Sequence, residues 1–162
     1  MPIIKLEIQI DAPVERVFDL ARCIDLHEAT MSKHKEKAVG GVTKGLIGMG
    51  ESVTWEATHF GTKQKLTSKI TAFERPKHFR DSMVIGAFKQ FNHDHFFEQN
   101  GEQTLMKDVF DYDSPLGILG KVADAVLLEK YMREILAERN QIIKTIAESE
   151  DWRKFLSGAP SS

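Results

Sequence analysis

The sequence predicts an α+β protein in which a curved, antiparallel, seven-stranded sheet wraps around a long C-terminal helix, with two short helices after the first strand. Seven segments alternate apolar and polar residues, and turn residues separate the last six. From Leu119 to Ile146, apolar residues instead recur at three- and four-residue spacing. A sheet cannot bury its concave face alone, and this helix is the only other large element that could cover it.

The first strand and the short helices occupy the first thirty residues. Apolar and polar residues alternate from Ile4 to Ile10, as in a half-buried strand. One-sided apolar residues from Val14 to Ala21 predict a short helix, and a second short helical piece is expected over 25–31. The polarity of this second piece indicates that it caps one end of the fold.

Six further strands are expected over 37–44, 51–60, 63–73, 78–84, 88–99 and 102–112. Gly61-Thr62 and Asn100-Gly101 read as two-residue turns, and Asn-Gly is the strongest short hairpin signal because both residues tolerate positive φ in a type I′ turn. The final helix is expected over 116–149. We therefore assign residues 1–150 to one domain and residues 151–162 to a polar C-terminal tail.

A cavity is expected where the sheet meets the first half of the last helix. Gly117, Gly120, Ala123 and Ala125 have no bulk with which to fill that space. The entrance should lie near the 45–50 loop, the loop around Gly86 and the start of the helix, since glycine-rich segments can open.

Composition narrows the function classes. With 22 basic and 24 acidic residues the net charge is −2, and no basic stripe indicates nucleic-acid binding. No apolar run is long enough to cross a membrane. The chain starts directly with a strand pattern rather than a signal peptide, and Cys23 is its one cysteine. A cytoplasmic location follows as the expectation, with a monomer or a homodimer left open.

Three short motifs carry a resemblance to a known superfamily. Ala12-Pro13-x-x-x-Val17-Phe18 opens the first helix, Phe73-x-x-Pro76 breaks the sheet, and Ser114-Pro115-Leu116-Gly117 precedes the last helix. With these motifs, residues 3–148 resemble the SRPBCC superfamily of helix-grip proteins, of the START and birch-pollen-allergen type. The string from Phe79 to Phe97 further resembles a bacterial subgroup described as polyketide cyclase/dehydrase-like or ligand-binding.

The resemblance implies a fold and a class of ligand more than an activity. Members of the superfamily mostly bind hydrophobic or amphipathic small molecules, lipids among them. The subgroup also occurs fused to sugar-nucleotide epimerase-like domains, which implies a protein partner of that kind.

Strand parity selects the residues that face the expected cavity. A two-residue turn at Asn100-Gly101 pairs His93 with Asp108 and His95 with Met106. The Gly61-Thr62 turn pairs Trp55 with Ser68. The aromatic members of this face argue that it is the inner one. The candidate ligand-binding residues are Trp55, His59, Asp81, Met83, Phe91, His93, His95, Phe110, Tyr112 and Gly120.

The His93–Asp108 pair is open to three interpretations. It could be a structural hydrogen bond between two strands, because an unpaired buried polar group costs about 1–3 kcal/mol. It could orient the polar end of a ligand. It could also be a catalytic acid/base dyad, in which the carboxylate orients the imidazole and Tyr112 is a further group that moves protons.

Two other kinds of chemistry find less support. No Ser or Cys sits at an obvious nucleophile elbow. His93-x-His95 with Asp81 or Asp108 could ligate zinc, but the spacing is common by chance and no cysteine cluster accompanies it, so neither a metal nor a cofactor is predicted. The function classes that remain are a binding or carrier protein, an enzyme of cyclase/dehydrase type, and a protein-interaction module.

Overall fold

Seven strands form one antiparallel sheet in the order β1-β7-β6-β5-β4-β3-β2. The computed structural model describes residues 2–113 and 122–157. The strands are β1 (Ile3–Ile10), β2 (Lys37–Gly41), β3 (Ser52–His59), β4 (Thr62–Glu74), β5 (His78–Ile85), β6 (Gln90–Asn100) and β7 (Gln103–Asp113). The predicted seven-stranded antiparallel sheet is thus confirmed, with strand ends shifted by a few residues.

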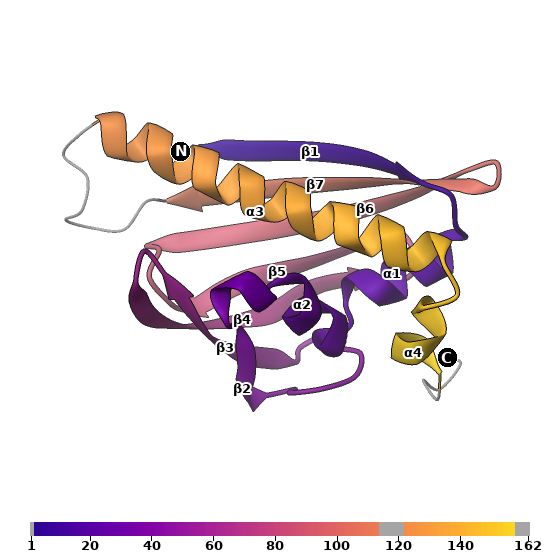
Figure 1. Cartoon of the computed structure of the whole chain (residues 1–162), viewed down its shortest axis with the longest axis horizontal. Helices are drawn as coiled ribbons and strands as arrows, with labels where there is room; N and C mark the ends of the chain where they lie inside the picture. The colour runs from indigo at the N-terminus through magenta and orange to yellow at the C-terminus, as the bar shows by residue number, and fades with distance from the viewer. Residues whose placement is uncertain (1, 114–121, 158–162) are drawn as a thin grey trace.

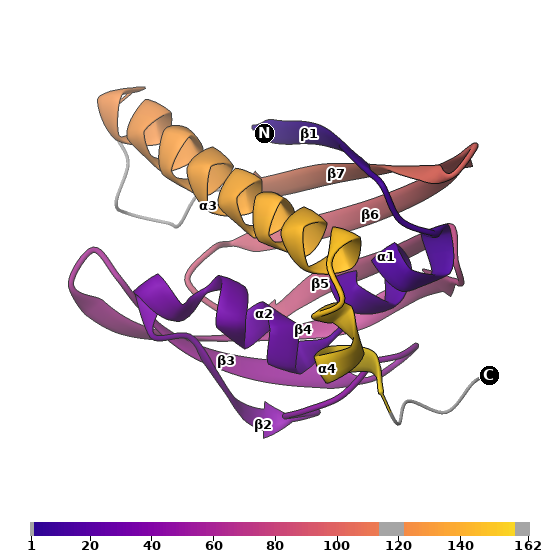
Figure 2. The ribbon, with the colours of Figure 1, turned by 45° about the vertical axis from the view of Figure 1, so that its right-hand side comes forward.

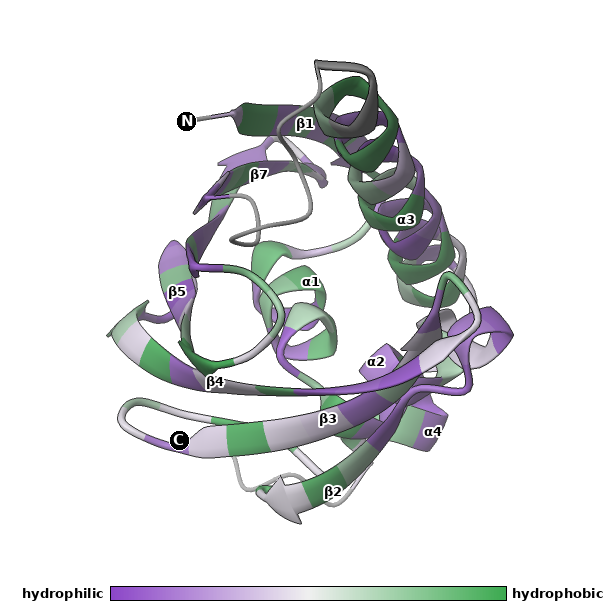
Figure 3. Ribbon diagram, turned by 90° about the vertical axis from the view of Figure 1, so that its left-hand side faces the viewer, coloured by the Kyte–Doolittle hydropathy of each residue, from purple (hydrophilic) through white to green (hydrophobic). Residues whose placement is uncertain are grey.

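The helices lie inside the curve of this sheet and along its open side. They are α1 (Val14–Ala21), α2 (Ile24–Thr30), the short 3-10 helix η1 (Ser32–His34), α3 (Val122–Glu148) and α4 (Trp152–Leu156). In the end-on view of Figure 3 the sheet curves from β1 round to β2, and α3 spans the gap between them. Figures 1 and 2 show that α3 crosses the sheet diagonally and meets α1 and α2. The expected start of this helix at residue 116 falls outside the described residues.

Both predicted hairpin registers are wrong by two residues. The β3–β4 turn consists of Phe60 and Gly61, with φ angles of 51° and 75°, so it has the type I′ conformation one residue earlier than expected. In the β6–β7 turn Asn100 pairs with Gln103 and has no positive φ, which leaves Gly101 and Glu102 as the loop. Because partners shift by two residues, every side chain keeps its face.

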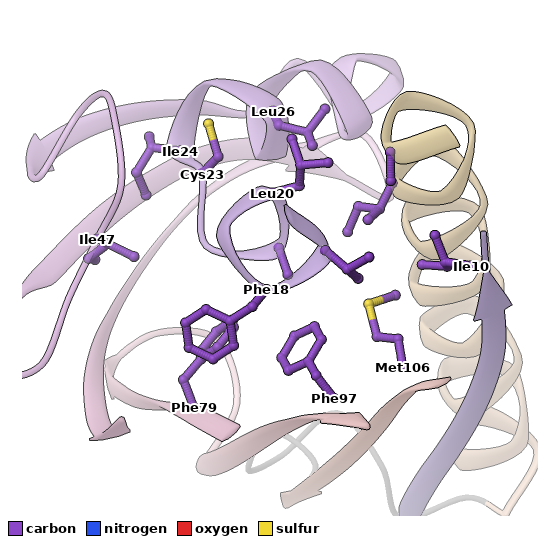
Figure 4. Close-up of a cluster of buried hydrophobic side chains, with 14 of the residues drawn as sticks. Ile10, Phe18, Leu20, Cys23, Ile24, Leu26, Ile47, Phe79, Phe97 and Met106 are labelled. Carbon is purple, nitrogen blue, oxygen red and sulfur yellow. The ribbon is translucent and has the colours of Figure 1, made fainter. Parts of the chain in front are cut away.

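A core of buried apolar side chains lies between α1 and the sheet. Phe18 on α1 is fully buried and makes edge-to-face contacts with the rings of Phe73, Phe79 and Phe97, at centroid distances of 5.1–5.4 Å. Figure 4 shows Phe18 pointing from α1 toward Phe79 and Phe97, with Met106 beside them. This packing fills part of the space between α1 and the inner face of the sheet.

The segment after α3 differs from the predicted polar tail. Residues 152–156 form α4, whose Trp152, Phe155 and Leu156 pack against the core. The guanidinium of Arg16 lies 4.3 Å from the centre of the Trp152 ring, which fixes α4 on α1. In the part of the chain that the structure describes, no helix is both long enough and apolar enough to span a bilayer.

Candidate ligand-binding pocket

A pocket of about 480 Å³ lies between the inner face of the sheet, the α1–α2 region and α3. Its wall is mostly apolar, with Trp55, Phe91 and Phe110 from the strands facing Leu128, Met132 and Leu136 from α3. The strands contribute these side chains to the wall because alternate residues of β3, β6 and β7 point to this face. The pocket is therefore the space that remains between the curved sheet and α3.

Seven of the ten predicted ligand-binding residues line this pocket: Trp55, His59, Asp81, Phe91, His93, His95 and Phe110. Met83 packs in the aromatic cluster beside the pocket instead. Tyr112 is fully buried behind the wall, stacked on Phe110 at 5.2 Å between ring centres. Its hydroxyl finds no hydrogen-bond partner among the described residues. Gly120, like the 117–123 part of the helix expected to line the cavity, lies outside the described side chains.

A cluster of ionisable side chains forms the polar part of the wall. His93 Nε2 lies 3.0 Å from Asp108 Oδ1, within hydrogen-bonding reach, so the two residues are in contact as expected. They are diagonal neighbours, however, since the residue directly opposite Asp108 is His95. The Nδ1 atom of His95 lies 2.8 Å from Asp108 Oδ1, close enough for charge attraction but not aligned as a hydrogen bond.

Asp81 on β5 completes this cluster. It lies directly opposite His93 in the β5–β6 register. His95 Nε2 and Asp81 Oδ2 form a hydrogen bond at 2.9 Å, and His93 Nδ1 lies 4.0 Å from the same oxygen. The two imidazoles thus lie between the buried carboxylate of Asp108 and the carboxylate of Asp81, which lines the pocket.

Two residues of α3 hold the buried carboxylate from the other side. Asn140 donates a hydrogen bond from Nδ2 to Asp108 Oδ2. Arg139 Nη1 lies 3.7 Å from Asp108 Oδ1 and donates to Asn140 Oδ1 at 3.0 Å, while its Nη2 donates to the carbonyl of Ala21 at 3.2 Å. Arg139 is 5% exposed and lines the pocket. The cluster therefore ties β5, β6 and β7 to α3.

The environment of each ionisable group shifts its pKa. Burial raises the pKa of both carboxyls, but the hydrogen bonds and the charges of the two imidazoles together outweigh it, and the pKa of Asp81 is lowered while that of Asp108 lies well below its usual range. Burial and the nearby His95 lower the pKa of His93. Burial also opposes charge on His95, yet Asp108 and Asp81 raise its pKa. These shifts favour a cationic His95 between two carboxylates, beside a neutral His93.

A second polar group sits toward the outside of the pocket. His59 Nδ1 lies 2.8 Å from the hydroxyl of Tyr131, which lies 3.3 Å from His34 Nδ1. Beside them are Phe60 and Leu127, which line the pocket yet are 64% and 58% exposed. Exposed apolar side chains on a pocket wall mark where it meets solvent, so we place the mouth here.

The loops expected at the entrance contribute one or two residues each to the wall. Ile47 comes from the 45–50 loop, and Ala87 and Phe88 follow Gly86. The third expected part of the entrance, the start of the last helix, falls on residues that the structure does not describe. The pocket is therefore bounded by these loops, while its exposed rim lies at Phe60 and Leu127.

Several wall residues escaped the sequence analysis. Arg139 and Asn140 belong to no motif of the sequence, and the charged neighbours of Arg139 favour an outer face of the helix. His27 lies over Trp55 at 4.3 Å between ring centres and pairs with Glu36 at 2.7 Å. The 25–31 segment was expected only to cap the fold. The sequence signal was Leu26 within this polar segment and Ile24 just before it, two apolar residues that the structure buries.

Metal-ligating groups also come together in this wall. One ligand atom from each of Asp81, His93 and His95 lies within 4.8 Å of the others. The sequence analysis predicted no metal because the His93-x-His95 spacing is common by chance and no cysteine cluster accompanies it. The β5–β6 register brings Asp81 beside both imidazoles.

Comparison with known proteins identifies the fold. No protein-family model and no curated protein sequence matches the chain. The crystal structure of TTHA0849 from Thermus thermophilus matches with a TM-score of 0.72 at 20% identity, over 98% of this chain and all of that one. A START superfamily protein from Mycobacterium smegmatis matches with a TM-score of 0.68 at 10% identity, over 90% of this chain and 97% of that one.

A third solved structure extends the same likeness. Ara h 8.0201 matches with a TM-score of 0.60 at 13% identity, over 89% of this chain and 98% of its own. Near-complete coverage of both chains in each case shows a shared architecture rather than a shared motif. The chain therefore has the helix-grip fold, and the resemblance to START and birch-pollen-allergen-type proteins is confirmed at the level of fold.

Proposed function

We propose that this protein binds a small amphipathic molecule in the pocket, with an apolar body against the aromatic wall and a polar group at the Asp81–His93 end. The observation that carries the proposal is a largely apolar wall in which Asp81, His93 and His95 form a compact set of ionisable side chains. Ligand sites typically have this composition, since apolar area supplies affinity and a few placed polar groups supply orientation.

The size of the pocket supports the same conclusion. Its volume of about 480 Å³ lies within the range of small-molecule sites, about 300–1,000 Å³. Trp55, Phe91 and Phe110 are 6% exposed or less, so the protein already holds this aromatic wall in place. A ligand that displaces water from it gains roughly 25 cal/mol for each Å² of apolar surface removed from water.

A pocket-filling variant tests the proposal. In a Trp152→Phe background, Trp55 is the remaining tryptophan, and its fluorescence reports directly on the pocket. Apolar probes should quench or shift this emission, and Ala57→Phe should weaken their binding at least tenfold by occupying the space. Thr58→Phe is the matched control, because its side chain lies on the opposite face of β3. Equal binding by both variants, or no binding of any apolar probe, would remove the proposal.

The polar end can be tested separately with His93→Phe. Affinity for a long-chain alcohol should fall about tenfold, equivalent to about 1.4 kcal/mol, while affinity for the matching hydrocarbon stays the same or rises. Equal losses for both ligands would show that His93 shapes the pocket without orienting a polar group. Native mass spectrometry of the purified protein would identify a co-purified molecule to use as the natural probe.

Proton transfer within the bound molecule is a second candidate function. It is favoured by the contact between His93 Nε2 and Asp108, because a carboxylate that orients an imidazole is the usual support of a general base. The test is turnover of the co-purified molecule. His93→Gln should abolish turnover and keep binding, whereas Tyr112→Phe should change neither, because Tyr112 lies behind the pocket wall. Unchanged turnover in His93→Gln would contradict this role.

A further inference from the structure

We propose that Asp81, His93 and His95 form a site for a divalent transition-metal ion such as Zn²⁺, opening on the pocket. The proposal does not depend on the identity of any organic ligand. It concerns an ion bound by the three side chains at the polar end of the pocket.

The positions of the three side chains support this site. Asp81 Oδ2 lies 2.9 Å from His95 Nε2 and 4.0 Å from His93 Nδ1. In a tetrahedral zinc site, ligand atoms about 2.0–2.1 Å from the ion are about 3.3 Å from one another, so the two distances bracket the spacing required. Adjacent strands carry all three residues, with Asp81 directly opposite His93. All three ligand atoms lie within 4.8 Å of one another, so an ion would have to draw the side chains closer together.

Asp108 provides an independent observation that points to a metal. His93 turns Nε2 and His95 turns Nδ1 toward Asp108 Oδ1, at 3.0 and 2.8 Å. The remaining nitrogens, His93 Nδ1 and His95 Nε2, are those that face Asp81. Metal-binding imidazoles almost always place their second nitrogen on a carboxylate, a carbonyl or water, which fixes the ring orientation. Here one buried carboxylate, itself held by Asn140, hydrogen-bonds the ring of His93 and lies against the second nitrogen of His95.

The stoichiometry of such a site follows from these contacts. The hydrogen bond between His95 Nε2 and Asp81 Oδ2 occupies the position where the ion would sit, so an ion that binds there has to replace it. Three protein ligands leave one coordination position directed toward the pocket, an arrangement found in catalytic rather than structural zinc sites. Arg139 contacts Asp108, the orienting carboxylate, and makes no ion pair with Asp81 in the described part of the chain.

Metal titration of the tag-free, chelator-treated protein tests the site. Zn²⁺ should bind one ion per chain, as measured by isothermal titration calorimetry, with a Kd tighter than about 10 µM. Co²⁺ should give the visible absorption of a low-coordinate site, and Zn²⁺ should displace it. Asp81→Asn should weaken binding at least tenfold. Asp108→Asn, which removes only the orienting carboxylate, should weaken it by about 10–100-fold.

The mouth of the pocket supplies the matched control. His34 and His59 also lie close together, with ring centres 5.0 Å apart, so His34→Asn with His59→Asn removes the alternative pair of imidazoles. This double variant should bind Zn²⁺ as the wild type does. Circular dichroism shows which variants fold, and His93→Gln replaces Asp81→Asn if the latter does not. The proposal is overturned by absence of 1:1 binding to the wild type, by full affinity in the folded Asp81 or His93 variant, or by loss of binding in the double variant.

Discussion

Replacing Asp108 with alanine should destabilise the fold far more than a typical buried polar substitution. Asp108 is 1% exposed and contacts two imidazoles, the amide of Asn140 and the guanidinium of Arg139. Removing one partner of a buried charged network costs about 3–5 kcal/mol, because the remaining charges are left uncompensated. A single unpaired imidazole would cost only about 1–3 kcal/mol. The larger figure applies here because Asp108 is shared by four side chains.

Urea unfolding followed by circular dichroism measures the change in the free energy of unfolding caused by Asp108→Ala, and thermal unfolding measures the change in Tm. For a chain of this length, 3–5 kcal/mol corresponds to a fall in Tm of roughly 6–20 °C. Asp113→Ala is the matched control, since it makes the same change on the same strand at a residue whose hydrogen bond to Gln90 is exposed. Its effect should stay within about 0.5 kcal/mol. If Asp108→Ala costs less than about 1 kcal/mol, or no more than the control, Asp108 does not organise the cluster.

Three further predictions concern stability. Burial raises the pKa of the Asp19 carboxyl, but the Arg75 and Arg22 guanidiniums outweigh it and hold this pKa below its usual value. Above the unfolded pKa of about 3.9, the carboxylate therefore contributes about 1 kcal/mol to the free energy of unfolding. This contribution is lost as pH falls through the lower folded pKa. Asp19→Asn should remove that part of the acid dependence of unfolding. Phe18→Ala should cost about 3–5 kcal/mol in urea unfolding, because three rings pack on this fully buried side chain; a loss below about 1 kcal/mol would contradict that packing. Tyr112→Phe should leave Tm unchanged or raised, since the buried hydroxyl has no partner among the described residues; a clear fall would reveal one.

Alternation along the strands was enough to predict the pocket face, although the register was wrong. Trp55, His93 and Phe110 line the pocket as expected, while their partners across the hairpins differ by two residues from those predicted. The period of a strand is two residues, so a shift of two preserves every face. The turn residues fixed the location of each hairpin but not which pair closes it. Asn100 takes part in the last pair of the ladder instead of the loop.

The helix side of the pocket could not be predicted in the same way. Arg139 sits among charged residues on α3, and by pattern alone it belongs to a solvent-facing side. In the structure it is buried, because α3 crosses the sheet where Asp108 offers it a carboxylate. Such a contact depends on the angle and height at which the helix meets the sheet. The angle and height are set by packing between elements far apart in the chain, so the spacing of residues along the helix does not predict them.

The free energy of folding does not account for the four ionisable side chains of the polar cluster. Asp81, His93, His95 and Asp108 occupy inward positions of the same sheet that elsewhere holds Phe91, Phe97 and Phe110. Apolar side chains at such positions would stabilise the fold at least as well, because replacing a buried ionic network as a unit is often neutral or favourable. Stability therefore gives little reason for four ionisable groups at these positions. A role at the pocket surface gives one, since His93, His95 and Asp81 all reach the wall that a ligand or an ion would touch.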